Sequence, residues 1–231
     1  MTLNSKNVPS SSKFKPQDPV DPGSYPARLV QVIDLGLQPQ SYEKETKDPK
    51  NEIYTTYELS DEFMKDEEGK DIADKPRWIS ESFTLNSLNS DRAKSTQRYY
   101  ALDPNAEHDG DWSKLLGTPA TVVLVSNPSK KDKTKVYNNI AATSTMRAKD
   151  AAKLPALKNP AKFFTLDDPD VDLFLTLPQF IQDKIKTNLE FGGSKLDELL
   201  EKAGKGTAKK AQPKNVEPED DEPEQEDGVN W

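Results

Sequence analysis

The feature that most constrains the fold is the order of the predicted elements: three strands, a helix and two strands. Strands are predicted where aliphatic, aromatic and β-branched residues prevail between turn-forming residues, and the helix where this alternation gives way to helical caps and spacing. Five short strands separated by turns are typical of a small barrel or sandwich. The predicted strands are residues 25–34, 53–59, 77–85, 118–126 and 133–143, and the predicted helix is 90–102.

This order is that of the OB-fold, a five-stranded, partly open barrel that commonly holds single-stranded nucleic acid. We therefore expect a mainly β (β + α) protein with an OB-fold-like barrel over residues 21–145, in which Gly36 bulges or bends the first strand. A small sandwich is the alternative, because one sequence does not reveal the order of strands in a sheet. Helices are also predicted over 178–189 and 194–203, within a helical extension (146–203) packed on the barrel.

Charge is distributed unevenly along the chain. The formal net charge is −8, but eight acids and no base lie between Glu217 and Asp227, and the rest of the chain has equal numbers of acids and bases. Blocks of like charge repel themselves and commonly serve as interaction tails. We therefore expect residues 204–231 to be a disordered linker and acidic tail, and residues 1–20, rich in Ser, Pro, Lys and Asn, to be a disordered arm.

The acidic tail includes a tryptophan, Trp231. A large ring in a mobile, charged segment is a liability unless a pocket on a partner receives it. The tail is therefore predicted to bind a partner protein. The predicted partner-binding residues are Asp220, Asp221, Glu226, Asp227 and Trp231.

Composition argues against most enzyme chemistry. Cysteine is absent and His108, in a polar loop, is the only histidine, so thiolate metal sites and most nucleophilic triads have no residues to use. A metal-dependent nuclease would need acids that converge at strand ends, whereas the acids here cluster in turns and in the tail. We expect no catalytic residue, no metal and no cofactor. Without an apolar run long enough to cross a bilayer, or a signal peptide, we expect a soluble cytoplasmic protein and no membrane partner.

Binding of single strands without sequence choice needs aromatic faces that stack on bases and cations that follow the backbone. Strand alternation separates Tyr54, Trp78 and Tyr137 from the apolar faces of their strands, and places Lys133 and Lys135 beside Tyr137. Packing in the sheet is the competing explanation for the aromatics, and edge protection for the lysines. The other predicted nucleic-acid-binding residues lie in or near loops that could border the same groove: Arg77, Arg92, Lys94, Arg98, Lys130 and Lys131.

Together these features resemble the single-stranded-DNA-binding proteins of tailed bacteriophages. The resemblance rests on the segments from Pro22 to Val30 and from Lys75 to Ser80, and on an acidic tail with a terminal aromatic residue. The tail departs from the bacterial pattern, which ends in Pro-Phe, so the resemblance leaves the docking partner open.

The resemblance implies a sequence-nonspecific protein that coats and protects single-stranded DNA during phage replication or recombination, in the cytoplasm of an infected bacterial host. It also implies recruitment of a polymerase, helicase-primase or recombinase through the tail, and assembly as a homo-oligomer on DNA. The alternative is a phage structural or assembly β-barrel protein without DNA binding, which would not retard poly-dT.

Overall fold

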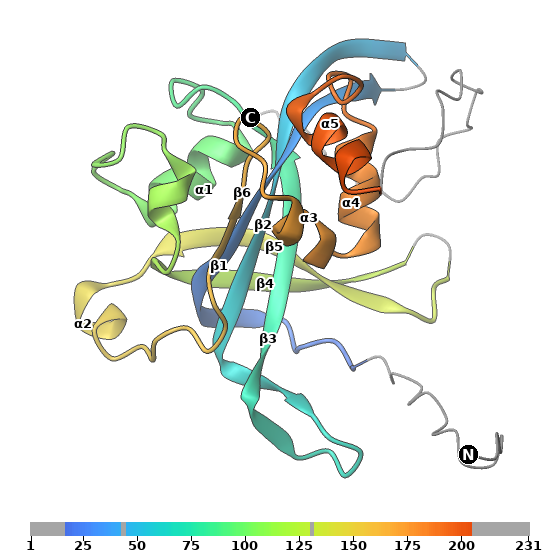
Figure 1. Cartoon of the computed structure of the whole chain (residues 1–231). Coiled ribbons are helices and arrows are strands. Elements are labelled where there is room, and N and C mark those ends of the chain that lie inside the picture. Colours follow the sequence, from blue (N-terminus) through green and yellow to red (C-terminus); the bar gives the residue numbers. More distant parts are fainter. Residues whose placement is uncertain (1–16, 43–44, 130–131, 205–231) are drawn as a thin grey trace, which may run out of the picture.

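The structure is a computed structural model, described over residues 17–42, 45–129 and 132–204. A strongly curved antiparallel sheet encloses one apolar core, and short helices near the C-terminal end of the described chain cover part of its outer side (Figure 1). The strands are β1 (Gly23–Tyr42), β2 (Glu45–Lys65), β3 (Asp71–Thr84), β4 (Pro119–Pro128), β5 (Val136–Thr145) and β6 (Lys162–Phe164). The helices are α1 (Lys94–Leu102), the 3-10 helix η2 (Trp112–Leu115), α2 (Ala148–Ala151), α3 (Val171–Thr176), α4 (Gln179–Lys186) and α5 (Lys195–Lys202).

The strands follow the order β3-β2-β1-β4-β5, and β6 pairs in parallel with β1. Central β1 is antiparallel to both β2 and β4, so that Ala27 lies opposite Leu59 on one side and Ala120 on the other. Backbone hydrogen bonds do not join β3 to β5 over the described residues, so the sheet remains open along that side. The expectation of a mainly β protein with an antiparallel sheet followed by helices is confirmed, but the sheet is not closed into a barrel by hydrogen bonds.

Strand β1 contributes to two apolar cores. Its pairing with β2 shifts register between Leu29 and Gln31 and again between Asp34 and Gly36, and each shift changes the face to which the following side chains point. Leu29 and Val32 therefore face the core inside the curved sheet, which we call the barrel core. Ile33 and Leu35 face the helices, in what we call the outer core. The predicted irregularity at Gly36 is confirmed: its φ is +76°.

Each core recruits side chains from distant parts of the chain. Tyr57, Phe83, Tyr99, Trp112 and Leu124 fill the barrel core, with the Trp112 ring 5.6 Å from that of Tyr99. The outer core joins β1 and β6 to α3, α4 and α5, and consists of Ile33, Leu35, Phe164, Phe174, Leu177, Ile181, Ile185, Phe191, Leu196 and Leu200. Burying one such side chain stabilises the fold by about 1.5–3 kcal/mol, which explains how short helices are held against the sheet.

Several boundaries differ from those predicted. The polar stretch 38–51, which by its composition was expected to be a loop between the first two strands, instead extends β1 and β2 into a long hairpin, because its residues pair backbone to backbone. Strand β5 begins at Val136, so Lys133 and Lys135 precede it. Helix α5 begins where expected: the Ser194 hydroxyl accepts a hydrogen bond from the Asp197 N–H over 3.2 Å. No helix within the described residues is long and apolar enough to cross a membrane.

Candidate nucleic-acid interface

A shallow groove follows the open side of the sheet, between β3 and β5. Two aromatic residues, one from each strand, are among its most exposed lining residues: Trp78 is 39% exposed and Tyr137 is 54% exposed. The segment 17–20 lies along the groove, where Val20 is hydrogen-bonded to Asn138. The groove is lined by Gln17, Pro19, Arg77, Trp78, Ile79, Ser80, Val136, Tyr137 and Asn138.

Alternation along β3 explains why Trp78 points outward. Ile79 and Phe83 are buried in the barrel core, so Trp78 and Ser80 take the opposite face. The indole is also held in place, because its Nε1 donates to Glu58 Oε2 over 3.2 Å. Trp78 therefore offers a partly exposed ring in a defined orientation, as stacking on a base requires.

One predicted cation lines the groove, and two more lie in the turn that precedes β5. Arg77 lines it and donates from Nη1 to the Asp18 carbonyl over 2.7 Å, which leaves other guanidinium N–H groups for a phosphate. Lys133 and Lys135 are exposed in the turn before β5. Lys135 Nζ lies 3.8 Å from Asp132 Oδ2, a surface pair of which both members are accessible to solvent.

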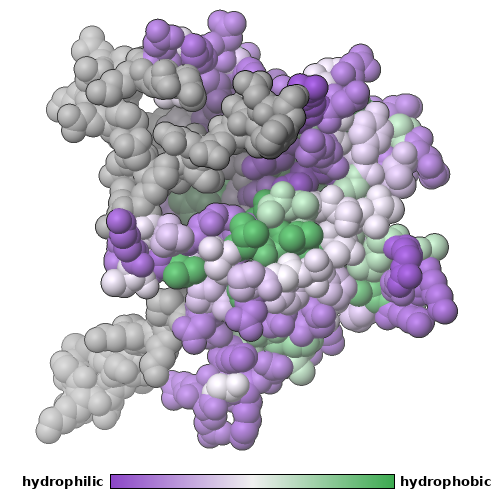
Figure 2. Space-filling view, turned by 180° about the vertical axis from the view of Figure 1, so that it is seen from behind, coloured by the Kyte–Doolittle hydropathy of each residue, from purple (hydrophilic) through white to green (hydrophobic). Residues whose placement is uncertain are grey.

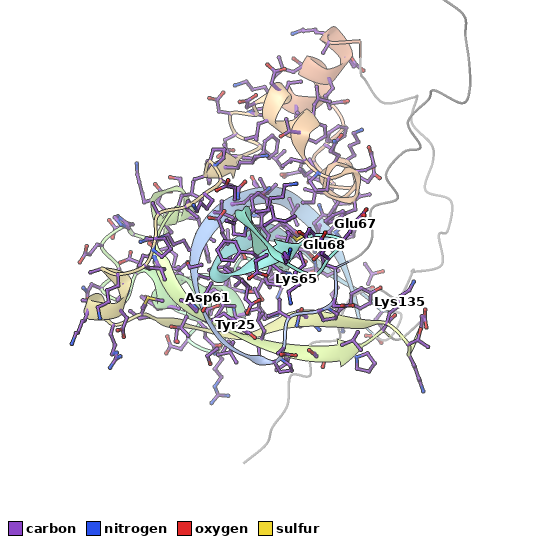
Figure 3. The ribbon with its side chains drawn as sticks, turned by 90° about the horizontal axis from the view of Figure 1, so that it is seen from below. Tyr25, Asp61, Lys65, Glu67, Glu68 and Lys135 are labelled. Carbon is purple, nitrogen blue, oxygen red and sulfur yellow. The ribbon has the colours of Figure 1, made fainter. Side chains whose placement is uncertain are left out.

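The region around Tyr25 is acidic, in contrast to the turn before β5. Figure 3 labels Tyr25 and Asp61 near one another, with Lys65, Glu67 and Glu68 on the β2–β3 hairpin and Lys135 towards the end of the β4–β5 hairpin. Burial, and then the carboxylates of Glu62, Asp21 and Asp61, raise the pKa of Tyr25. Carboxylates repel phosphates, so this acidic region disfavours a polyanion, whereas the lysines of the β4–β5 turn do not.

Two predicted site residues are placed where they do not form an open binding surface. Tyr54 does lie opposite Ile53 and Tyr57, but it packs in the outer core, with its ring 6.1 Å from that of Phe180 in an edge-to-face arrangement. Burial accordingly raises its pKa. Arg98, expected in or near a loop, is 3% exposed within α1. Neither residue lines the groove.

Arg98 was expected to contact nucleic acid, but its side chain is instead bonded to groups inside the protein. Its Nε donates to Glu81 Oε1 over 2.6 Å, and its Nη2 donates to the Ile140 carbonyl over 3.1 Å. Arg98 thus joins β3 to β5 from inside the sheet. The helical position of Arg98 was predictable, but the distant acid that it meets was not.

The remaining predicted cations are outside the groove or outside the described residues. Arg92 is exposed just before α1, and Lys94 at the start of α1 lies 3.8 Å from Glu81 Oε2; neither lines the groove. Lys130 and Lys131 lie outside the described residues. So do the partner-binding residues predicted in the tail: Asp220, Asp221, Glu226, Asp227 and Trp231.

Sequence reasoning missed Glu58 and the segment that it binds. Glu58 is only 4% exposed and lies opposite Trp78 in the β2–β3 pairing. It accepts hydrogen bonds from residues 158 and 159, about a hundred positions along the chain. A β-strand acid between a tyrosine and a leucine gives no local indication of such a contact.

Figure 2 shows a face of the molecule that is largely hydrophilic, with hydrophobic residues at its centre and smaller hydrophobic areas toward its edges. Within the described residues, no group of three or more His, Cys, Asp or Glu side chains could hold a metal ion. The exposed large hydrophobic residues are Trp78, Leu85, Val136, Tyr137, Phe163, Phe180 and Leu189.

Comparison of the chain with models of known protein families and with curated proteins finds no match.

Proposed function

We propose that this chain binds single-stranded DNA without sequence preference, in the groove between β3 and β5. The observation that carries the proposal is the pairing of two exposed aromatic residues, Trp78 and Tyr137, across the open side of the sheet. Stacking on an aromatic ring contributes about 1–3 kcal/mol per base and tolerates every base, because each has a π-face. Arg77 and the lysines before β5 supply positive charge next to these rings.

The sheet supports an OB-fold-like architecture as the finer description of this fold. Central β1 pairs with both β2 and β4, a helix stands between β3 and β4, and β3 and β5 are the strands left to meet. This connectivity favours an open five-stranded barrel as the description of the sheet. Side-chain contacts through Arg98, instead of a backbone ladder, join β3 and β5.

In this proposal the protein coats and protects single strands during phage replication or recombination. The acidic tail would recruit a polymerase, helicase-primase or recombinase. A phage structural or assembly protein without DNA binding is the competing function. The two functions are distinguished directly by whether the protein binds an unstructured oligonucleotide.

The proposal is tested by titrating a fluorescently labelled poly-dT oligonucleotide with the full chain and following anisotropy at moderate salt. Trp78→Ala and Tyr137→Ala should each weaken binding roughly 5- to 150-fold, the loss of one stacked base. Phe180→Ala is the matched control, since Phe180 is 61% exposed but lies on α4, outside the groove. Absence of poly-dT binding, or equal affinity of all three variants and the parent, would reject the proposal.

Salt dependence tests the two lysines separately. Each phosphate contact on a single strand contributes about −0.7 to the slope of log affinity against log salt. Lys133→Gln and Lys135→Gln should each make the slope shallower by up to this amount. Lys149→Gln on α2 removes the same charge from an exposed site away from the β4–β5 turn, and should leave the slope unchanged.

A further inference from the structure

Three residues form a row across neighbouring strands at the edge of the proposed DNA site. Arg28 on β1 pairs with Glu58 on β2, and Glu58 pairs with Trp78 on β3. A cation, an anion and the proposed stacking residue thus stand side by side. This row connects the DNA site to a segment far along the chain, residues 154–159, which we call the strap.

Glu58 is the central contact of the row. Its carboxylate is almost fully buried, and burial of a charge is tolerated only when hydrogen bonds replace the lost water. Oε1 accepts from the Lys158 N–H over 2.6 Å, and Oε2 accepts from Asn159 Nδ2 over 2.7 Å and from the Asn159 N–H over 3.3 Å. The remaining donor is Trp78 Nε1, at 3.2 Å from Oε2.

Arg28 holds the other end of the strap. It donates from Nη2 to the Leu154 carbonyl over 3.0 Å and from Nε to the Pro155 carbonyl over 2.8 Å. Its third bond, from Nη1 to the Gly117 carbonyl, joins it to the loop before β4. The strap carbonyls therefore accept hydrogen bonds from the Arg28 guanidinium, and the strap amides donate to the Glu58 carboxylate.

Part of the strap does not pack directly against the sheet. Between them lies a cavity of about 300 Å³, lined in part by Leu59, Phe63, Pro76 and Leu157. A cavity forfeits the contacts that filled space would provide. The hydrogen bonds to Arg28 and Glu58 therefore help to hold the strap in place, and Oε2 of Glu58 joins Asn159 of the strap to the indole of Trp78.

We propose that Glu58 is a positioning residue for DNA binding, which fixes the ring of Trp78 in the stacking orientation while the strap fixes Glu58. This inference rests on the proposed function. Without this hydrogen bond the Trp78 side chain would be more mobile, and it would lose more conformational entropy when a base stacks on it. A ring that is already held in the stacking orientation avoids that entropic cost. Glu58 itself need not touch DNA.

A double-mutant cycle separates positioning from a general structural effect. Glu58→Gln leaves one acceptor oxygen for the four donors that the carboxylate serves. It should weaken poly-dT binding about two- to twelvefold when Trp78 is present, since each ordered side chain costs about 0.5–1.5 kcal/mol. In a Trp78→Phe background, where the ring has no N–H to donate, Glu58→Gln should have no further effect. Equal losses in both backgrounds would overturn the inference.

Glu52→Gln is the matched control. Glu52 is also a buried acid on β2, 6% exposed, but it is bonded to Gln40 Nε2 at 2.6 Å and Lys184 Nζ at 3.2 Å, away from Trp78. Its substitution should lower stability without changing poly-dT affinity. If Glu58→Gln does not fold, Asn159→Ala replaces it in the cycle, because that change removes one strap donor and keeps the carboxylate.

The NMR resonance of the Trp78 indole N–H provides an independent measurement. It can be assigned because it disappears in the Trp78→Phe variant. Glu58→Gln should shift this resonance and accelerate exchange of its proton, and Glu52→Gln should do neither. An unmoved resonance would overturn the inference. Failure of the parent chain to bind poly-dT would instead reject the proposed function, so the two failures are distinguishable.

Discussion

The side chain of Asn138 makes both backbone hydrogen bonds of Val20. Asn138 Nδ2 donates to the Val20 carbonyl, and Asn138 Oδ1 accepts from the Val20 N–H, each over 2.7 Å. The amide thus replaces a neighbouring peptide group on the open side of the sheet, and Val20, 5% exposed, contributes to the barrel core. Arg98 joins β5 to β3 from the inside, whereas Asn138 secures the segment 17–20 to β5.

Asn138→Ala should therefore lower the free energy of unfolding by about 2–3 kcal/mol, because it removes two hydrogen bonds and leaves two backbone groups without these partners. Asn138→Asp should not recover this loss, since a carboxylate still accepts from the Val20 N–H but sets its second oxygen against the Val20 carbonyl, to which it cannot donate. Urea denaturation measures both. Asn139→Ala, on the adjacent residue, should stay within about 0.5 kcal/mol of the parent; a similar loss there would show that the Val20 bonds are not the cause.

The buried ion pair of Arg98 and Glu81 gives a second prediction about the open side. The two side chains are only 4% and 9% exposed, and removal of Arg98 leaves the Glu81 carboxylate with only the more distant Lys94 ammonium, 3.8 Å away. Arg98→Met should cost about 3–5 kcal/mol in denaturant unfolding, and adding Glu81→Leu should recover part of that loss. Arg92→Met, at an exposed position before α1, is the control and should be nearly neutral.

Because Arg98 is enclosed, Arg98→Lys should lower stability without changing poly-dT affinity. A lysine retains the charge but cannot make the same pair of directed bonds. A weakened affinity in a fully folded Arg98→Lys protein would restore the original interpretation of Arg98 as a DNA contact.

Alternation predicted which apolar side chains of β2 and β3 point into the core, although the opposite face of β2 is largely covered as well. Ile53, Tyr57 and Phe83 lie inside as expected, and Trp78 lies outside. The long β1–β2 hairpin was not predictable from apolar spacing, because its outer part is held by backbone pairing of polar residues. The outer core was equally hidden, since the register shift between Leu29 and Gln31 determines which of the following residues of β1 face the helices.

The candidate site was only partly predictable for a related reason. Trp78, Tyr137 and Arg77 could be found because strand alternation and residue type are local properties. Tyr54 shares the outward facing of Trp78, yet α4 brings Phe180 over it from more than a hundred residues away. The role of Glu58 likewise depends on the strap. Contacts of this kind are set by tertiary packing, which one sequence does not display.

Asp103 provides a prediction for pH dependence. Although burial alone would raise it, the pKa of Asp103 is lowered by hydrogen bonds from the Glu107 N–H, the His108 N–H and the Tyr99 hydroxyl. A carboxyl with a lower pKa in the folded state stabilises the fold above its unfolded pKa, and this contribution is lost as pH falls through the folded value.

Asp103→Asn should therefore be less stable than the parent near neutral pH, and the difference should shrink as the pH falls to about 3 and below. Unfolding in urea across this range measures it. Asp91→Asn, at an exposed position, should show a much smaller difference throughout. A difference for Asp103→Asn that is constant with pH would mean that its charge is not what stabilises the 105–110 loop.

Gly36 joins the irregularity of β1 to the attachment of the helices. Its φ is +76°, and an added Cβ would clash with Asn188 and lie 2.7 Å from Leu166 Cδ1. Asn188 is needed at this place, because its Oδ1 accepts from the Leu37 N–H over 3.0 Å. Only a glycine combines this backbone conformation with so close an approach.

Gly36→Ala should consequently lower the free energy of unfolding by more than the left-handed backbone conformation alone would. The additional loss should be about 1–3 kcal/mol, because the new methyl group is overpacked against Asn188 and Leu166. Gly193→Ala is the matched control, since Gly193 has a φ of +80° with open space around its Cβ position, and it should show only the left-handed cost of about 1–2 kcal/mol. Urea unfolding of both variants makes the comparison. Equal losses would mean that Asn188 moves aside freely and that the contact does not attach the helices to β1.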